Sequence, residues 1–485
     1  MKTVVIDPIT RLEGHGKINI FLNSQGNVEN AYLQIPELRG FERFCQGRRA
    51  EDMPQITSRI CGVCPVAHHF ASAKALDDAF SVQPTSTAKK LRELMYCGYI
   101  IYDHILHFYY LGGPDFVVGP DAPAAKRNIL GVIEEKGVEI GKEVIKHRAY
   151  GQKITGILGG KATHPVCGLP GGVSKSLSKE EVAEIKKMSE SCVKFADFSI
   201  ELLHDIVLGN KKYVDLITSD PYQLKTYNMG LVDKDNKVNF YDGKIRVTDQ
   251  NSNEYKKFEV KDYLDNIREH VEEWSYMKFP YLKELGWKGL VDGEKSGIYR
   301  VGPLGRLNAS EGMATSKANK EYKIMYDTLG GKPVNSTLAF HWARLIELMY
   351  ASERAVELTK DPEIHSDKIR NPVGKPGEGF GVIEAARGTL IHHYKLNDKG
   401  LVDKANLIVA TTNNAGAITM SVRDAAKGLI KNGKISDGIL NMVEMAFRAY
   451  DPCFACATHT LPGGMQLEVN IYNNKKSLIR KIRRN

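Results

Sequence analysis

Apolar side chains recur at helical spacing over much of this chain. Between residues 85 and 111 they fall three or four positions apart, at Leu91, Leu94, Met95, Tyr102, Ile105 and Phe108. This spacing places them on one face, which predicts a long helix that is buried along that face. By the same pattern we expect further helices at 68–80, 125–148, 178–208, 334–359, 415–431 and 436–450.

Alternation of apolar and polar positions, the pattern of a half-buried strand, occurs elsewhere. Residues 16–22 and 28–35 alternate around a turn at 24–26, and a further β segment is expected over 381–410. Residues 220–300 are polar and rich in Lys and Asp, with short alternating runs that predict a peripheral β-containing region. The patterns together predict a helix-dominated α+β fold with a central long-helix bundle and small peripheral β regions.

Composition is that of an ordinary globular protein. The 485 residues are 42% hydrophobic and 26% charged, which allows a large core. Length alone would accommodate about three domains. The sequence contains no run of about 18 apolar residues and does not begin with a signal-peptide pattern. We therefore expect a cytoplasmic protein without a membrane span.

The net charge of +9 could by itself indicate a nucleic-acid partner. The charge is concentrated at the end of the chain, however, because residues 460–485 contain six Lys or Arg and one Glu. The remainder carries only a mild positive excess for its size. No nucleic-acid partner is predicted.

Eight cysteines are present, and four of them form two Cys-x-x-Cys pairs near opposite ends of the chain. The other four are scattered, which does not fit a disulfide scaffold and suits a reducing compartment. We expect these scattered residues to be small buried hydrophobic side chains. They are Cys45, Cys97, Cys167 and Cys192.

The paired cysteines, Cys61 with Cys64 and Cys453 with Cys456, are candidate ligands of a soft metal. Residues three apart on a helical turn can direct both sulfurs to one ion. By spacing alone a structural zinc site is the usual interpretation, and an iron–sulfur cluster is the next. Zinc modules close within a few dozen residues, whereas Cys453 follows Cys64 by 389 positions. That separation favours a buried site that organises the whole chain.

The residues around both pairs resemble the two nickel-binding motifs in the large subunit of nickel–iron hydrogenases. The motifs here are Arg59-x-Cys61-Gly-x-Cys64-x-x-x-His68 and Asp451-Pro-Cys453-x-x-Cys456-x-x-His459. Further blocks that resemble this family lie at 7–16, 39–42, 103–109, 301–308 and 384–390. The resemblance extends over essentially the whole chain and is weakest over residues 220–300.

The resemblance implies that Cys61, Cys64, Cys453 and Cys456 hold nickel. It also implies that Cys64 and Cys456 bridge to an iron that carries carbon monoxide and cyanide. Thiolates are soft donors that suit both metals, and the metals keep them deprotonated. The implied reaction is the reversible oxidation of dihydrogen.

The resemblance further assigns the first step of proton exit to Glu13, behind a nickel thiolate. From the residues alone, the default interpretation of Glu13 would be a surface glutamate or one paired with the nearby Arg11.

The resemblance also implies roles for five further residues around the metals. Arg387 matches an arginine whose guanidinium lies over the bimetallic site, and Asp103 and Asp451 match the carboxylates that hold it. Thr411 matches a hydroxyl that hydrogen-bonds a cyanide nitrogen. His68 is expected to support the ligands rather than to bind metal. For isolated residues of these types, a solvated surface position would be the default.

A magnesium-type ion is also implied, with Glu42, the carbonyl of Leu407 and His459 in the matching positions. Carboxylate and carbonyl oxygens suit a hard octahedral ion. Histidine is an unusual magnesium ligand, so iron or another divalent ion is an open alternative.

Two positions depart from the family pattern, since Ala386 and Ala410 stand where many members have proline. Both changes remove local rigidity and neither removes a ligand.

Residues 1–459 are expected to form one catalytic subunit. In the family a specific maturation protease removes the segment beyond the final histidine, which here predicts cleavage between His459 and Thr460. The segment 460–485 would then be a C-terminal extension. A permanent C-terminal strand is the alternative, because residues 465–471 alternate.

Dihydrogen oxidation yields two electrons, but the scattered cysteines form no cluster motif. An iron–sulfur small subunit is therefore the expected partner, with a further electron-transfer subunit beyond it. The sequence is most like the cytoplasmic multisubunit group, and within it the archaeal methyl-viologen-reducing type. That type does not reduce deazaflavin and passes electrons to heterodisulfide reductase in methanogenesis.

NAD-linked and deazaflavin-linked hydrogenases are open alternatives. Two hypotheses outside the hydrogenases are a structural zinc scaffold and a quinone-pocket subunit of a respiratory complex. Such quinone-pocket subunits share the fold ancestry but lack the metal cysteines.

Overall fold

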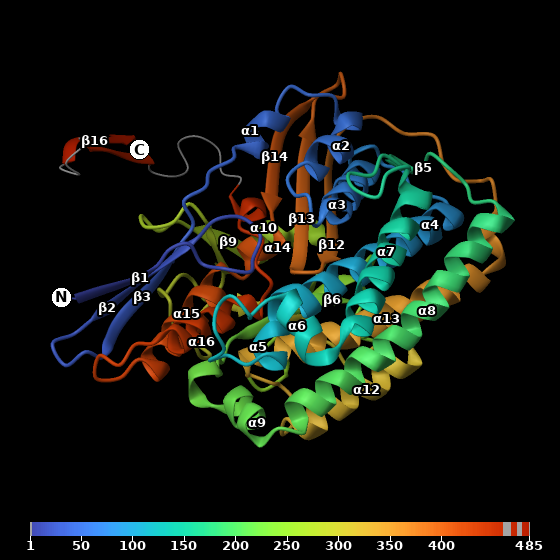
Figure 1. Ribbon diagram of the computed structural model, residues 1–485. Coiled ribbons are helices and arrows are strands. Elements are labelled where there is room, and N and C mark those ends of the chain that lie inside the picture. The colour runs from blue at the N-terminus through green and yellow to red at the C-terminus, as the bar shows by residue number, and fades with distance from the viewer. Residues whose placement is uncertain (1, 459–466, 473–477, 485) are drawn as a thin grey trace.

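The protein is a helix-dominated α+β structure in which long helices form one side and small sheets the other (Figure 1). The computed structural model describes residues 2–458, 467–472 and 478–484. The four longest helices are α4 (Ser86–Leu106), α7 (Val138–Gly159), α8 (Lys179–Leu203) and α13 (Phe340–Lys360). Helix α4 packs against α7 and α13, and α8 packs against α13, which gives the predicted long-helix bundle.

Helix α4 shows how the sequence forms this bundle. The side chain of Thr85 caps its N-terminus by accepting a hydrogen bond from the Ala88 N–H. Gly98 on α4 faces Gly151 on α7 so closely that a Cβ at Gly151 would lie 2.7 Å from the Gly98 carbonyl oxygen. The two glycines therefore allow the helix axes to approach. A π-helical turn over His107–Gly112 continues the helix, close to the predicted end.

One predicted helix is wrong. Residues 125–148 do not form a single helix, because α6 (Ile129–Lys136) ends at Gly137 and α7 begins after it. Gly137 has a φ of 93°, a backbone conformation that glycine adopts at little cost and that ends a helix.

The remaining helices are shorter, and those predicted at 68–80, 415–431 and 436–450 are present as α3, α15 and α16. They are α1 (Phe41–Cys45), α2 (Met53–Ser58), α3 (Pro65–Ala79), α5 (Pro114–Val117), α9 (Lys211–Thr218), α10 (Tyr263–Asn266), α11 (Gly302–Ala309), α12 (Ser316–Thr328), α14 (Ala410–Asn413), α15 (Ala415–Leu429) and α16 (Asp437–Arg448).

The structure contains two antiparallel three-stranded sheets. The first, near the N-terminus, contains β1 (Lys2–Ile6), β2 (Lys17–Leu22) and β3 (Val28–Gln34), of which β1 was not predicted. The second contains β12 (Glu378–Ala385), β13 (Gly388–Leu396) and β14 (Val402–Ile408).

Helix α3 lies directly on β12. A Cβ at Gly381 would come within 2.2 Å of the Ala71 carbonyl oxygen, so the glycine in β12 permits this contact. The contact fixes the start of α3, which follows Cys64, relative to the β12–β13 hairpin.

Residues 220–300 contain strands, as predicted. A four-stranded sheet runs in the order β11 (Tyr299–Arg300), β6 (Tyr227–Val232), β7 (Lys244–Thr248) and β8 (Glu254–Phe258), and β9 (Ile267–His270) pairs with β10 (Phe279–Leu282). Every residue of β6 is buried. Two short pairs complete the structure: β4 (Gly168–Leu169) with β5 (Gly172–Val173), and β15 (Leu467–Tyr472) with β16 (Leu478–Arg484).

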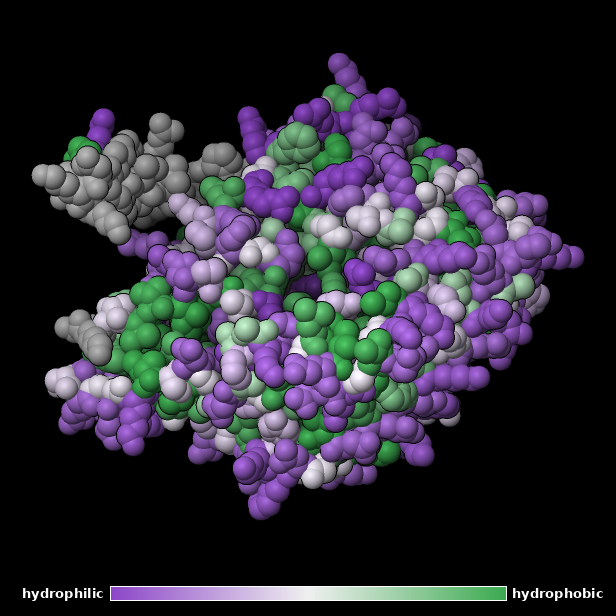
Figure 2. All heavy atoms as spheres, in the orientation of Figure 1, coloured by the Kyte–Doolittle hydropathy of each residue, from purple (hydrophilic) through white to green (hydrophobic). Residues whose placement is uncertain are grey.

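The surface is mixed in polarity. In Figure 2, hydrophobic side chains gather over the N-terminal sheet, whereas the side formed by α8 and α12 is mostly hydrophilic. Among the described residues, no helix is both long enough and apolar enough to cross a membrane.

Candidate metal centre

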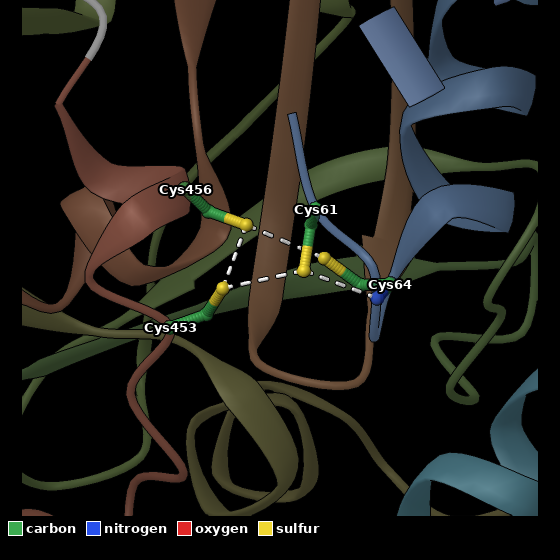
Figure 3. Close-up of side chains that lie close together, drawn as sticks. All are labelled: Cys61, Cys64, Cys453 and Cys456. Carbon is green, nitrogen blue, oxygen red and sulfur yellow. Dashed lines mark hydrogen bonds between the residues drawn. The ribbon is translucent and has the colours of Figure 1, made fainter. Parts of the chain in front are cut away.

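The four paired cysteines meet at one buried point (Figure 3). The sulfurs of Cys61 and Cys453 lie 3.4 Å apart, those of Cys64 and Cys456 lie 3.5 Å apart, and those of Cys453 and Cys456 lie 2.7 Å apart. All four sulfurs lie within 4.8 Å of one another. The convergence predicted from the two pairs is therefore present.

The first pair does not lie on a helical turn, contrary to expectation. Pro65 occupies the first turn of α3, so the helix begins only after Cys64. The preceding loop instead folds around a sulfur, since the backbone N–H groups of Val63 and Cys64 donate to Cys61 Sγ at 3.2 and 3.3 Å. Of the second pair, Cys456 lies in a one-turn 3-10 helix over Ala455–Ala457.

This donor set fits a soft metal. With metal–sulfur bonds of about 2.3 Å, two sulfurs on one ion can lie up to about 4.6 Å apart. The neighbouring sulfur pairs here lie 2.7 to 3.5 Å apart, within that limit. Hydrogen bonds from the neighbouring thiols lower the pKa of Cys61, whereas burial raises the pKa of Cys453 and Cys456. Burial therefore disfavours four thiolates together, and a bound metal would stabilise them.

Glu13 lies against this sulfur cluster. The thiol of Cys453 donates to Glu13 Oε2 at 2.8 Å, and the Phe454 N–H donates to the Glu13 carbonyl oxygen at 2.9 Å. Burial raises the pKa of the Glu13 carboxyl. Arg11 forms its ion pair with Asp115 instead, so the alternative of a Glu13–Arg11 pair is wrong.

Arg387, in the turn between β12 and β13, connects two buried carboxylates. Its Nη1 lies 3.1 Å from Asp103 Oδ2 and its Nη2 lies 3.0 Å from Asp451 Oδ2. Asp103 comes from α4, and Asp451 precedes the second cysteine pair. Burial raises the pKa of Asp451 to about 7. The structure thus brings together the three residues that were expected to act as one unit.

Thr411, in α14, contacts the second cysteine segment. Its Oγ1 accepts a hydrogen bond from the Cys453 N–H at 3.0 Å, which leaves the hydroxyl proton free to be donated.

Ala386, one of the two positions where many family members have proline, makes a hydrogen bond through its backbone, because its N–H donates to the hydroxyl of Tyr99 at 3.1 Å. A proline at that position could not make this bond.

His68 is buried and belongs to a chain of polar groups. Its Nδ1 lies 3.2 Å from His392 Nε2, and His392 Nδ1 lies 2.8 Å from the hydroxyl of Tyr394, which donates to Ser72 at 3.1 Å. Burial lowers the pKa of His68 to about 4, so its imidazole is neutral at pH 7. The group of potential metal ligands at this centre contains the four cysteines and not His68.

Two of the three residues matched to a divalent ion lie together. The backbone N–H of Leu407 donates to Glu42 Oε1 at 2.8 Å, and Glu42 is buried. Burial raises the pKa of Glu42 to about 7. The third residue, His459, lies outside the described residues.

One residue at the centre was missed by the sequence reasoning. Arg39 hydrogen-bonds the backbone beside both cysteine pairs. Its only signal in the sequence is its place in the block 39–42, three positions before Glu42.

Comparison with known proteins decides the family. A model described as nickel-dependent hydrogenase matches residues 39–129 and 143–459, and a second, described as HoxL-like, matches residues 3–38. The chain belongs to the nickel-dependent hydrogenase family. The predicted family, fold class and enzyme class are therefore confirmed, and the zinc-scaffold and quinone-pocket alternatives are rejected.

Relatives of this hydrogenase match along the whole chain. An F420-non-reducing hydrogenase iron–sulfur subunit of Archaeoglobus profundus is 48% identical over 485 residues, covering all of both chains. The beta subunit of the NAD-reducing hydrogenase HoxS of Cupriavidus necator is 38% identical, covering 99% of both chains. A crystal structure of an NAD+-reducing [NiFe]-hydrogenase in the H2-reduced state has a TM-score of 0.90 and 37% identity, covering 95% of this chain and 100% of that chain.

These similarities support a large subunit of a multisubunit hydrogenase that works with an iron–sulfur subunit. In the described part of the chain, the four converging cysteines form the one group that could hold the metal of a nickel-dependent hydrogenase.

Proposed function

We propose that this hydrogenase oxidises dihydrogen reversibly at a nickel–iron centre held by Cys61, Cys64, Cys453 and Cys456. The observation that carries the proposal is the convergence of these four sulfurs inside a chain of the nickel-dependent hydrogenase family. When bound, nickel and an iron with carbon monoxide and cyanide ligands would polarise dihydrogen so that it splits into a hydride and a proton. Cys64 and Cys456, whose sulfurs lie 3.5 Å apart, would be the two thiolates that hold the iron as well as the nickel.

Two residues of the protein, Cys453 and Glu13, would carry the proton away from the metals. The sulfur of Cys453 can take a proton and pass it along its 2.8 Å contact to the carboxylate of Glu13. Because Glu13 is held by both its side chain and its backbone, the acceptor oxygen stays in line with the sulfur. Glu13 is in this proposal the first relay of proton exit.

Arg387 would supply a fixed positive charge beside the metals. Asp103 and Asp451 orient its guanidinium and balance its charge in a buried site, where such a charge acts strongly on a bound cyanide or on developing negative charge. Thr411 would donate its free hydroxyl proton to a cyanide nitrogen. His68 would hold the first cysteine segment through its buried polar chain.

A divalent ion, magnesium or another, would bind beside Glu42, the carbonyl of Leu407 and His459. The raised pKa of Glu42 supports this, because a bound cation would stabilise the charged carboxylate that burial alone disfavours.

Electrons would leave through an iron–sulfur small subunit. The cysteines outside the centre are all buried, and among the described residues only the four site cysteines form a group that could hold a metal. Beyond the small subunit we propose heterodisulfide reductase and a further electron-transfer subunit, in the cytoplasm and in a methanogenic type of metabolism. This is the archaeal non-deazaflavin type suggested by the Archaeoglobus relative.

An NAD-linked enzyme is the second candidate, because the NAD+-reducing relatives are also similar along nearly the whole chain. Assay of the purified complex with NAD+ and with a heterodisulfide separates the two, and a deazaflavin in the same assay tests the third hydrogenase type.

The division of the chain is also a proposal. Residues 1–459 would form the catalytic subunit, with 220–300 as a β-containing part, and a maturation protease would remove residues 460–485 once nickel is bound. Strands β15 and β16 pair with each other within that segment.

Isotope exchange between D2 and H2O tests the proposed reaction without an electron acceptor. The complex should form HD and H2, and a Cys453→Ala variant should form neither. Cys192→Ala, which changes a buried cysteine in α8, is the matched control and should retain exchange. Exchange that survives in Cys453→Ala would contradict the proposal.

A further inference from the structure

The side chain of Arg39 joins the two chain segments that carry the metal-binding cysteines. Its Nη1 donates to the carbonyl oxygen of Ile60 at 2.6 Å and to that of Ala455 at 3.1 Å. Ile60 immediately precedes Cys61, and Ala455 immediately precedes Cys456. One nitrogen atom therefore spans the two halves of the site.

Two further hydrogen bonds strengthen this connection. Arg39 Nη2 donates to the carbonyl oxygen of Arg59 at 3.4 Å, and the Arg39 backbone N–H donates to that of Thr458 at 3.1 Å. The guanidinium also lies over the ring of Phe41, with its carbon 4.9 Å from the ring centre. Each cysteine segment is thus bound to Arg39 at two carbonyl groups.

Other side chains that reach this region hold only one segment. The hydroxyl of Tyr102 donates to Val63, and that of Thr412 donates to Ala457. Apart from the cysteines themselves, Arg39 is the one side chain in the described part of the chain that hydrogen-bonds both segments.

We propose that Arg39 is a positioning residue that holds the two cysteine segments at the spacing that metal binding requires. A guanidinium stays charged and offers five donors in a rigid planar fork, so it can bind carbonyl groups from two segments at once. Residues around a metal site that orient its ligands typically affect metal affinity 10–100-fold when changed, by order of magnitude. The inference rests on the proposed nickel site and adds how the protein maintains it.

The test compares Arg39→Met and Arg39→Lys with wild type in the complete hydrogenase complex. Arg43→Met is the matched control, because Arg43 lies on the exposed side of α1 and pairs with Gln46. Two quantities are measured: the rate of nickel loss to a chelator, and amide hydrogen exchange in residues 59–64 and 453–458.

Arg39→Met should lose nickel about 10–100-fold faster than wild type, and both segments should exchange faster. The rates of nickel loss and amide exchange in Arg39→Lys should lie between those of wild type and Arg39→Met, because an ammonium group can donate to a carbonyl but lacks the planar fork. Arg43→Met should match wild type.

Nickel loss and exchange at the wild-type rate in Arg39→Met would overturn the inference, as would a lower unfolding temperature with unchanged nickel loss. If Arg39→Met does not fold, Arg39→Lys decides by the same two measurements, and wild-type values again overturn the inference. Nickel and D2 exchange in the wild-type complex test the proposed function separately, whatever the Arg39 variants do.

Discussion

The thiol of Cys453 donates a hydrogen bond to the carboxylate of Glu13 at 2.8 Å, and the backbones of the same two residues form an isolated parallel bridge. Residues 440 positions apart are therefore fixed to each other through both side chain and backbone. A carboxylate is thereby held against a sulfur of the candidate metal centre, so a glutamate near the N-terminus is in position to serve a site to which both ends of the chain contribute cysteines.

Replacing the carboxylate should block proton movement without disturbing the metal. Glu13→Gln keeps the size of the side chain but cannot accept and release a proton at neutral pH. We expect D2–H2O exchange to fall by roughly 10²–10⁴-fold, with nickel content unchanged. Glu37→Gln is the control, because Glu37 is only half-buried and contacts His15 outside the centre. Wild-type exchange in Glu13→Gln would remove Glu13 from the proton path.

Arg387 should tolerate even a conservative change poorly. A lysine keeps the positive charge but cannot span Asp103 and Asp451 with a planar fork. We expect Arg387→Lys to lower kcat for dihydrogen oxidation with a viologen dye by on the order of 10²-fold, while nickel is retained. The matched variant Arg354→Lys alters a more exposed arginine that pairs with Glu93. Equal kcat values in the two variants would show that charge alone is sufficient at this position.

Acid should destabilise the fold through His69. Its Nδ1 lies 3.0 Å from the Pro54 carbonyl oxygen and its Nε2 accepts from the Gly168 N–H at 2.8 Å, an arrangement that requires the neutral ring. Burial lowers the pKa of His69 to about 4, so between pH 6.5 and about pH 4 the unfolded chain binds a proton that the folded chain does not. The stability contributed by neutral His69 is complete above pH 6.5 and falls as the pH drops toward 4, by roughly 3 kcal/mol in total.

Urea unfolding at pH 7.5 and pH 5 measures this effect. From pH 7.5 to pH 5, the free energy of unfolding of wild type should fall by about 2 kcal/mol more than that of His69→Gln, because glutamine cannot take up the proton. His365→Gln, at an exposed position, should behave like wild type. The same pH dependence in His69→Gln and wild type would assign the acid sensitivity to other groups.

The mature chain should end at His459. Intact mass spectrometry of the active, nickel-loaded enzyme should find the mass of residues 1–459, whereas protein made without nickel should retain residues 460–485. An active, nickel-loaded chain that still ends at Asn485 would contradict cleavage and favour the permanent-strand alternative.

Much of this structure could be predicted from local patterns. The long helix α4 was predicted from its apolar spacing, because burial of one face dictates that spacing. The meeting of Cys61 and Cys453 was suggested by their shared metal chemistry, which left zinc and an iron–sulfur cluster open. Nickel was implied by the resemblance of the surrounding motifs to a known family.

Other features depend on contacts that no local pattern encodes. Gly137 separates α6 from α7, and one glycine within a helical pattern does not by itself indicate a break. The role inferred for Arg39 depends on carbonyl groups of Ile60 and Ala455, which any residue type possesses. Backbone acceptors leave no mark in the sequence, so this connection became visible only in the folded chain.

An infrared spectrum of the anaerobically purified complex, matured in its native host, tests the central claim most directly. Protein groups absorb little in the region of metal-bound carbon monoxide and cyanide stretches. A nickel–iron centre on the four cysteines predicts one carbonyl band and two cyanide bands, all absent from a Cys456→Ala variant, which would lack one of the four proposed thiolate ligands. No such bands in the wild-type complex would contradict the assignment of a nickel–iron centre to this chain.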